Sequence, residues 1–187
     1  MQGMPAVGMQ ASGAGESNLA RRPVTAAVAV AAVGAATILG AYFFQYVMGL
    51  PPCPLCLDQR IAYYVSIPLA VLLAVGAGRQ APRRLVMFGL GVIALAMLFN
   101  AGLSVYHAGI EWKWWPGPQE CSGPLGDLTA GGGLMSQHGN VTLVRCDEAA
   151  WRLLGVSLAG YDVLISLALS AIAAWGAAGA AREPLTP

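Results

Sequence analysis

The chain contains four cysteines, and their positions are the strongest indication of redox chemistry in the sequence. Cys53 and Cys56 form a C-x-x-C motif in a proline-rich segment that begins at Pro51. Prolines suit the first turn of a helix, where unpaired backbone N–H groups and the helix dipole favour a thiolate over a thiol. The other two cysteines, Cys121 and Cys146, are widely spaced. The motif therefore predicts a reactive thiol pair where a helix begins.

Zinc binding and inert structural disulfides are two other interpretations of these cysteines. A C-x-x-C motif suits half of a four-cysteine zinc site, but structural zinc sites usually present two close pairs, and Cys121 and Cys146 are far apart in the sequence. Two structural disulfides would be ordinary in an oxidising compartment. Against them, a C-x-x-C disulfide closes a small, strained ring, and strained exposed disulfides are typically reactive. We predict redox-active cysteines and no metal.

The composition indicates an integral membrane protein. Hydrophobic residues make up 57% of the 187 residues, charged residues make up only 10%, and the mean hydropathy is +0.61. Soluble domains carry about 25% charged residues, so this set could not cover the surface of a soluble fold. The net charge of +1 provides no basic field for nucleic acid. The composition therefore excludes a disordered chain, a coiled coil and an ordinary cytosolic enzyme.

Four apolar stretches are long enough to cross a bilayer as helices, which requires roughly 20 residues each. We predict these helices at about 24–48, 60–78, 85–106 and 156–178. The first is too long for a secretory signal, whose apolar region has roughly 7–15 residues, and it ends in an aromatic cluster suited to the membrane interface. The prediction is an all-α membrane protein, a four-transmembrane-helix bundle. It forms a single domain over 21–187 after a disordered tail at 1–20.

Basic residues set the expected orientation of these helices. Six arginines lie before the first helix, between the second and third, and after the fourth: Arg21, Arg22, Arg79, Arg83, Arg84 and Arg182. The two other loops, about 49–59 and 107–155, hold more acidic than basic residues. The positive-inside rule therefore places both termini in the cytoplasm and the two loops on the outer face. All four cysteines are then outside, where disulfides are the expected state.

Arg60 follows Cys56 by four residues, one helical turn further along the same face. Its guanidinium is expected to stabilise a thiolate at Cys56 or the charge on a reduced ligand. The alternative is that Arg60 only extends to the lipid headgroups. An arginine at the start of a membrane helix is otherwise costly to place, so the sequence favours the functional role.

The second outer loop is expected to position its two cysteines differently. An aromatic run at 111–115 suits the headgroup layer. Asp147 and Glu148 follow Cys146 and are expected to cap a short helix that rests on the membrane. Cys121 precedes a glycine-rich stretch and is expected to move more freely. A tethered cysteine and a mobile one fit a thiol relay, although an ordinary loop disulfide would use the same residues.

With a C-x-x-C motif in the first outer loop and a spaced cysteine pair in the second, the chain resembles the disulfide bond formation protein B family. The runs that carry the resemblance are 53–60, 114–121 and 144–157, and it covers about 24–178. It implies a multi-pass thiol:quinone oxidoreductase of the bacterial inner membrane with its active site on the periplasmic face. The expected partner is a soluble, thioredoxin-fold dithiol oxidase like DsbA, which the enzyme reoxidises.

The resemblance also implies a role for each cysteine. Disulfides would join Cys53 to Cys56 and Cys121 to Cys146. The second pair would exchange with the soluble oxidase, with Cys121 forming the mixed disulfide. Cys146 would then attack Cys53, and Cys56, nearest the quinone ring, would pass the electrons on.

A quinone cofactor near the C-x-x-C motif is part of the same implication. Arg60 would lie beside the ring, and His107 looks like a family histidine near the quinone, although alone it would more often be an interfacial histidine. Gln59 is a further candidate for the same neighbourhood. Ubiquinone is expected rather than menaquinone. The other expected partners are the membrane quinone pool and the lipid bilayer, with no nucleic acid.

Two other functions fit parts of the sequence. A structural membrane subunit with disulfide-braced outer loops would explain the cysteines without catalysis, although the second to fourth helices lack the buried charges of an ion path. A quinone-linked enzyme of the vitamin K epoxide reductase type is the other alternative. In that family the C-x-x-C motif is expected late in the chain, whereas here it follows the first helix.

Asp162 is the acidic residue inside the predicted fourth helix. An ionisable residue in a membrane helix is by default a candidate for function. Asp162 is only about a turn and a half from Gly155, so we expect it to be exposed at the membrane interface.

Overall fold

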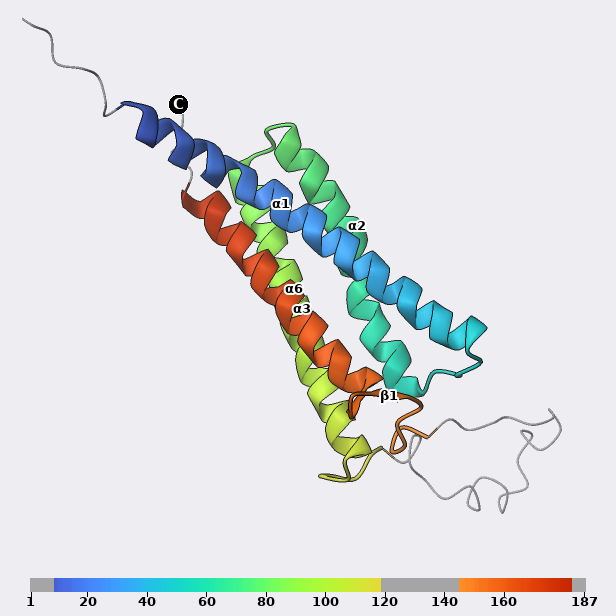
Figure 1. Cartoon of the computed structure of the whole chain (residues 1–187). Helices are drawn as coiled ribbons and strands as arrows, with labels where there is room; N and C mark the ends of the chain where they lie inside the picture. The colour runs from blue at the N-terminus through green and yellow to red at the C-terminus, as the bar shows by residue number, and fades with distance from the viewer. Residues whose placement is uncertain (1–8, 119–144, 183–187) are drawn as a thin grey trace, which may run out of the picture. The chain divides into compact units, whose positions relative to one another are not determined.

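The computed structural model of the chain describes residues 9–118 and 145–182 (Figure 1). Cys121 and the glycine-rich part of the second outer loop lie outside these described residues. The described elements are the helices α1 (Met9–Tyr42), α2 (Pro54–Gly78), α3 (Arg83–Glu111) and α6 (Leu158–Arg182), the π-helix η1 (Phe43–Val47), and the strands β1 (Arg152–Leu153) and β2 (Val156–Ser157).

Four helical segments are long and apolar enough to cross a membrane, one in each of α2, α3 and α6 and one that runs from α1 through η1. These segments are Arg21–Val47, Pro54–Gly78, Arg83–Glu111 and Leu158–Ala181, with mean hydropathies between 1.9 and 2.1. Helices satisfy all their backbone hydrogen bonds internally, as a bilayer requires. The predicted fold class, an all-α membrane protein with four transmembrane helices, is confirmed. The cytoplasmic position of the termini stays a prediction.

Helix α1 starts earlier than expected. It begins at Met9, so residues 9–20, which we assigned to a disordered tail, are helical. Adding residues to an existing helix forms one hydrogen bond for each residue fixed, so the apolar span supports this extension. Residues 1–8, the rest of the predicted tail, lie outside the described part of the chain.

Helix α2 begins earlier and helix α3 ends later than predicted. α2 begins at Pro54, which has no N–H group to satisfy and suits a first helical turn. α3 continues to Glu111. Cys56 and Gln59 therefore belong to the first turns of α2, and His107 belongs to the last turns of α3, rather than to loops. Helical backbone holds all three side chains in fixed directions.

A short β-hairpin stands where we predicted a membrane-resting helix after Cys146. β1 and β2 pair antiparallel, and the two residues between them, Leu154 and Gly155, have φ of 51° and 82°. Two-residue hairpin loops need positive φ at both positions, which is easy for glycine. The predicted helix cap does not form because the Asp147 carboxylate is bound by two basic side chains. The predicted helix is therefore wrong.

The structure consists of two compact units. Unit 1 comprises Met1–Ala35, Val65–Ala96 and Ala168–Pro187, and unit 2 comprises Ala36–Tyr64 and Met97–Leu167. Unit 1 includes the turn between α2 and α3, and unit 2 includes the described cysteines and the hairpin. The single domain that we expected over 21–187 stays a prediction.

Small residues and one arginine connect the helices of unit 1. A Cβ added at Gly176 of α6 would lie 2.4 Å from the Cβ of Ala26 on α1, so the two backbones approach closely here. The guanidinium of Arg83, the first residue of α3, donates a hydrogen bond of 2.8 Å to the carbonyl of Ala181. The turn between α2 and α3 therefore lies against the end of α6.

Candidate active site

The C-x-x-C motif caps the start of α2. The backbone N–H of Leu57 donates to the Cys53 carbonyl at 3.2 Å, and the backbone N–H of Cys56 donates to the Cys53 sulfur at 3.2 Å. The two sulfur atoms lie 2.7 Å apart, and both cysteines are free thiols in the structure. The structure therefore describes the reduced pair, and the Cys53–Cys56 disulfide stays a prediction for the oxidised protein.

His107 of α3 contacts the first of these thiols. Its Nε2 lies 3.6 Å from the Cys53 sulfur, and its Nδ1 lies 3.2 Å from the Gln59 side-chain nitrogen. An amide nitrogen can only donate, so Nδ1 accepts and the imidazole proton is on Nε2, facing the sulfur. The structure thus brings three predicted site residues, Cys53, Gln59 and His107, into one hydrogen-bonded chain.

These contacts favour the thiolate at Cys53. The hydrogen bond from the Cys56 thiol is the largest cause, and His107 and the Cys56 N–H add to it against the opposing effect of burial. Together they lower the pKa of Cys53 to about 5. We expected the thiolate at Cys56 instead. A thiol with a low pKa is both a ready nucleophile at neutral pH and a good leaving group.

Cys146 lies beside the same pair of groups. Its sulfur, the Cys53 sulfur and a ring nitrogen of His107 are all within 4.8 Å of one another, and all three residues are buried. Cys146 is disulfide-bonded in the structure, and a disulfide sulfur is not a thiolate ligand for a metal ion. Cys121 lies outside the described residues, so the Cys121–Cys146 pairing stays a prediction.

Charged residues around Asp147 hold the segment that carries Cys146. Lys113, just after α3, donates to the carbonyl and the carboxylate of Asp147 at 2.8 and 2.7 Å. Arg145 binds the same carboxylate in a bidentate manner at 2.9 and 2.8 Å. The two cations, Arg145 first, hold the pKa of Asp147 well below its usual range. This ionic link ties the Cys146 segment to the end of α3.

Trp115 covers the buried cysteines. It packs against a cluster that contains Cys53 and Cys146, and its indole N–H donates to the Tyr106 carbonyl at 2.8 Å. A Cβ added at Gly109 would lie 2.1 Å from the Trp115 ring, so only glycine permits this position of the indole. Trp115, the last residue of the aromatic run at 111–115, therefore packs against the buried cysteines instead of serving only as an anchor in the headgroup layer.

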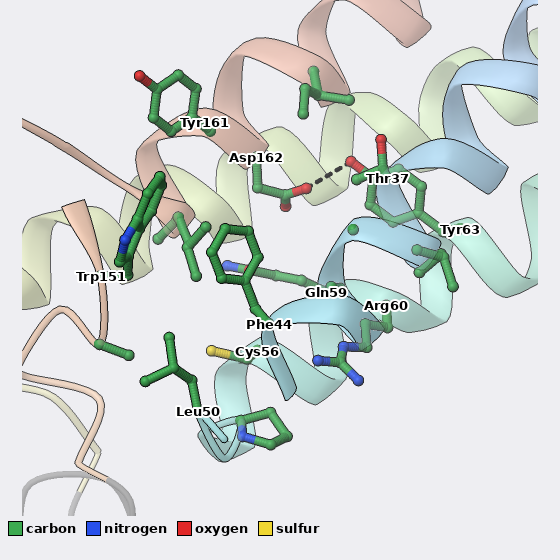
Figure 2. Close-up of a pocket in the computed structure, with 18 of the residues that line it drawn as sticks. Thr37, Phe44, Leu50, Cys56, Gln59, Arg60, Tyr63, Trp151, Tyr161 and Asp162 are labelled. Atoms are coloured by element: carbon green, nitrogen blue, oxygen red, sulfur yellow. Dashed lines mark hydrogen bonds between the residues drawn. The ribbon is translucent and has the colours of Figure 1, made fainter. Parts of the chain in front are cut away.

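A pocket opens on the other side of the C-x-x-C motif. It has a volume of about 450 Å³, and Cys56, Gln59 and Arg60 line it together with many apolar side chains. Figure 2 shows the Cys56 sulfur directed into this pocket. Phe44 and Trp151 form an aromatic wall, with ring centroids 4.9 Å apart. Cys56 therefore faces the pocket, whereas Cys53 is buried toward Cys146.

Arg60 is held by residues that we did not single out from the sequence. It donates to the side-chain oxygen of Gln45 in η1 at 2.7 Å, and its guanidinium lies 5.5 Å from the centre of the Tyr42 ring. Arg60 is buried rather than extended to the headgroups. A π-helical turn is frequent at functional sites, and here it directs Gln45 toward Arg60. The sequence contains no signal for this turn.

Asp162 is not exposed at an interface, contrary to our expectation. It lines the pocket and accepts hydrogen bonds from Tyr63 of α2 at 2.6 Å and from Asn100 of α3 at 3.1 Å. Ser104 lies 2.6 Å from the same carboxylate, and Ser166 contacts both Tyr63 and Asn100.

The signal for this polar network was present in the sequence. Polar residues four apart occur inside two membrane helices, Asn100 with Ser104 and Asp162 with Ser166, and this spacing places each pair on one helix face. Buried polar side chains in membrane helices face the protein interior and pair with one another.

The chain is similar to proteins of disulfide bond formation. The family model described as "Disulfide bond formation protein DsbB" matches residues 22–176. "Disulfide bond formation protein B" of Psychrobacter sp. (strain PRwf-1) is 31% identical over 138 residues, which cover 72% of this chain and 78% of that protein.

Two further relatives agree with this match. "Disulfide bond formation protein B" of Shewanella sp. (strain ANA-3) is 30% identical over 66% of this chain and 69% of its own length. "Disulfide bond formation protein B 2" of Pseudomonas syringae pv. syringae (strain B728a) is 30% identical over 72% of this chain and 77% of its own length. No solved structure matches the chain significantly.

Proposed function

The chain belongs to the family of disulfide bond formation protein DsbB, and from this premise we propose that it is a thiol:quinone oxidoreductase. It is a multi-pass membrane protein of disulfide bond formation. In the proposed reaction it reoxidises a soluble dithiol oxidase of the thioredoxin fold and passes two electrons to a membrane quinone.

The observation that carries this proposal is the approach of Cys146 to Cys53, whose sulfurs are within 4.8 Å of each other. A thiolate of the soluble partner attacks Cys121 and releases Cys146 as a thiolate. Cys146 then needs only a small movement to attack Cys53 of the oxidised Cys53–Cys56 pair, which releases Cys56. Each exchange forms one S–S bond and breaks another, so no electrons are lost.

The return steps complete the cycle. The second thiol of the partner closes the partner's disulfide and frees Cys121, which attacks Cys146 and restores the loop disulfide. Cys53 leaves this bond as a thiolate, and its low pKa makes it a good leaving group. Cys53 and Cys56 then close their own disulfide and give up two electrons. The net result is one disulfide in the partner and one quinone reduced.

The pocket fits a quinone as the electron acceptor. Its volume of about 450 Å³ falls within the range of roughly 300–1,000 Å³ that is typical of small-molecule sites. The aromatic wall of Phe44 and Trp151 suits a flat ring, and Arg60 and Gln59 supply donors for carbonyl oxygens. A bound quinone supplies a two-electron acceptor at this place. Cys56 would face it across the pocket.

We place the protein in the bacterial inner membrane with both termini in the cytoplasm and the cysteines on the periplasmic face. The arginines before α1, between α2 and α3, and at the end of α6 support this orientation through the positive-inside rule. A tag after Pro187 should then be accessible only from the cytoplasm. External access to the tag would reverse the proposed orientation.

One assay tests the proposed reaction. Purified protein is mixed with a reduced thioredoxin-fold dithiol partner and a soluble ubiquinone, and quinone absorbance and partner thiols are followed together. We expect one quinone reduced for each partner disulfide formed, and no quinone reduction by Cys56→Ser. A matched control, Leu57→Ala, changes the adjacent exposed residue and should keep activity. Turnover by Cys56→Ser at the wild-type rate would contradict the assignment.

A further inference from the structure

Asp162 is a carboxyl group in the pocket wall that the steps above do not use. It lines the pocket together with Cys56, and Figure 2 shows both side chains directed toward its interior. Among the described residues Asp162 takes part in no ion pair. An unpaired carboxylate inside a membrane helix is costly, so such residues commonly serve substrate or proton pathways.

The hydrogen bonds of Asp162 accommodate two protonation states. Ser104 has one hydroxyl proton but two neighbouring acceptors, the Asn100 carbonyl at 2.8 Å and Asp162 Oδ2 at 2.6 Å. If Ser104 donates to Oδ2 while Tyr63 donates to Oδ1, both oxygens act only as acceptors, which is the arrangement of an ionised carboxylate. If Ser104 donates to the Asn100 carbonyl, the short contact to Oδ2 needs a proton on Asp162, which then donates to Ser104. The Asp162 carboxyl can therefore gain or lose a proton while only the hydroxyl hydrogen of Ser104 changes position.

The remaining partners hold this arrangement in place. Ser166 accepts a hydrogen bond from Asn100 at 3.0 Å and lies 3.2 Å from the Tyr63 hydroxyl, which donates to Asp162 Oδ1. Ser104 and Ser166 are fully buried, and Asn100 and Tyr63 are 2% exposed. The groups that contact the carboxyl come from α2 and α3, so two neighbouring helices fix its position.

Few other charged or titratable groups share these surroundings. Arg60 and Tyr63 of α2 and Tyr161 of α6 line the same pocket, and His107 of α3 is near enough to act on the Asp162 charge. The α1 residues that line the pocket, Thr37, Ile38, Gly40 and Ala41, do not titrate. Among the described residues that line the pocket, Asp162 therefore supplies the carboxyl group.

We propose that Asp162 is a proton donor in the reduction of the quinone, a role that rests on the proposed function. When Cys53 and Cys56 form their S–S bond, they release two electrons, and the two carbonyl oxygens of the quinone must gain two protons. Cys53 leaves its bond to Cys146 as a thiolate in the proposed cycle, so the pair supplies one proton, from Cys56, and Asp162 supplies the other. Asp162 is left as a carboxylate, Ser104 turns its hydroxyl onto Oδ2, and a solvent proton restores the acid.

Infrared spectroscopy tests whether Asp162 stores a proton, independently of turnover. Wild-type protein and Asp162→Asn are compared in lipid nanodiscs at neutral pH in water and in heavy water. We expect the wild type to show the carbonyl band of a protonated carboxylic acid, shifted in heavy water and missing from Asp162→Asn. Identical spectra in this region would overturn the proposal, because no proton would be available for transfer.

Single-turnover kinetics test whether that proton is used. Pre-reduced Asp162→Asn should reduce a soluble quinone about 100-fold more slowly than the wild type, as expected for loss of a general acid. Quinone binding, measured by quenching of tryptophan fluorescence, should be unchanged. Asp162→Glu, which restores an acid, should recover part of the rate. Equal rates for Asp162→Asn and the wild type would contradict the proposal.

Ser170→Ala is the matched control for a structural effect. Ser170 lies on the same helix as Asp162 but bonds to the Ala94 carbonyl and not to the carboxyl or its partners, so this variant should keep both the infrared band and the rate. An equal loss of rate in Ser170→Ala and Asp162→Asn would assign these side chains a packing role only. If the wild type itself reduces no quinone, the proposed function fails; normal wild-type turnover with an unaffected Asp162→Asn overturns the Asp162 proposal alone.

Discussion

His107 Nε2 lies 3.6 Å from the Cys53 sulfur, and both side chains are 3% exposed. The Gln59 amide fixes the imidazole by donating to Nδ1, which leaves the Nε2 proton facing the sulfur. A buried thiolate with a donor aimed at it is a prepared reactive group rather than a structural cysteine. This contact joins α2 to α3 at the point where Cys146 also approaches.

The titration of Cys53 gives the first prediction. Its pKa of about 5 lies below the ordinary thiol value, so the folded protein favours the thiolate, and that preference is lost as pH falls through about 5. In reduced protein that lacks the two loop cysteines, thiolate absorbance should be constant between pH 7 and 8 and fall by half near pH 5. A thiol with an ordinary pKa of about 8.5 would instead still be titrating between pH 7 and 8.

Removal of the imidazole should shift this titration. His107→Phe keeps an aromatic ring but deletes the Nε2 donor. We expect the pKa of Cys53 to rise by about one to two units, since one good hydrogen bond to a charged group is worth roughly 1.5–3 kcal/mol. The same thiolate absorbance measures it. Tyr106→Phe, a change on the same helix, is the control. An unaltered titration in His107→Phe would contradict the role of His107. The low pKa of Cys53 would then be due only to Cys56 and the helix start.

Arg60 should contribute to quinone affinity. Arg60→Ala removes a charged donor from the pocket wall, and we expect KM for quinone to rise about tenfold or more. Arg79→Ala, in the turn between α2 and α3, is the matched control and should leave KM unchanged. If Arg60→Ala also leaves KM unchanged, Arg60 serves only in packing against Gln45 and Tyr42.

The order of exchange at the loop cysteines is open to a trapping experiment. Cys146 is 1% exposed, so an incoming protein should react with Cys121 first. A partner that keeps only its attacking cysteine, activated as a mixed disulfide with 5-thio-2-nitrobenzoate, should form a lasting covalent adduct with reduced Cys146→Ala. The Cys121 thiolate attacks the activated sulfur and releases the nitrobenzoate thiolate, and no local thiol remains to resolve the adduct. Cys121→Ala should give none. Equal adduct from both variants on a non-reducing gel would contradict the directional relay.

The four helices and the start of α2 at the C-x-x-C motif were predictable because they depend on local sequence. Apolar length determines a membrane helix, and prolines favour a first turn. The placement of His107 and Gln59 in one neighbourhood was implied by family resemblance and agrees with the contacts of the structure.

The features that sequence reasoning missed depend on partners far apart in the chain. The predicted cap at Asp147 failed because Lys113 of a distant segment takes its carboxylate. Asp162 looked interfacial from its distance to the helix start, but Tyr63 and Ser104 reach it from two other helices. Such contacts form only when helices pack. The four-residue spacing of Asp162 and Ser166 indicates a buried polar face, but it does not identify the residues of other helices that meet this face.

The relay between the cysteine pairs is the central claim, and a cross-linking measurement tests it most directly. Removal of Cys56 and Cys121 in the double variant Cys56→Ser, Cys121→Ser leaves Cys53 and Cys146 alone, with sulfurs within 4.8 Å of each other. Mild oxidation should join them, and mass spectrometry of an unreduced digest should identify the bond. The control Cys53→Ser, Cys121→Ser leaves Cys56 and Cys146 and should not cross-link, because Cys56 faces the pocket. Free thiols at Cys53 and Cys146 after oxidation, or equal cross-linking in the control, would contradict the relay.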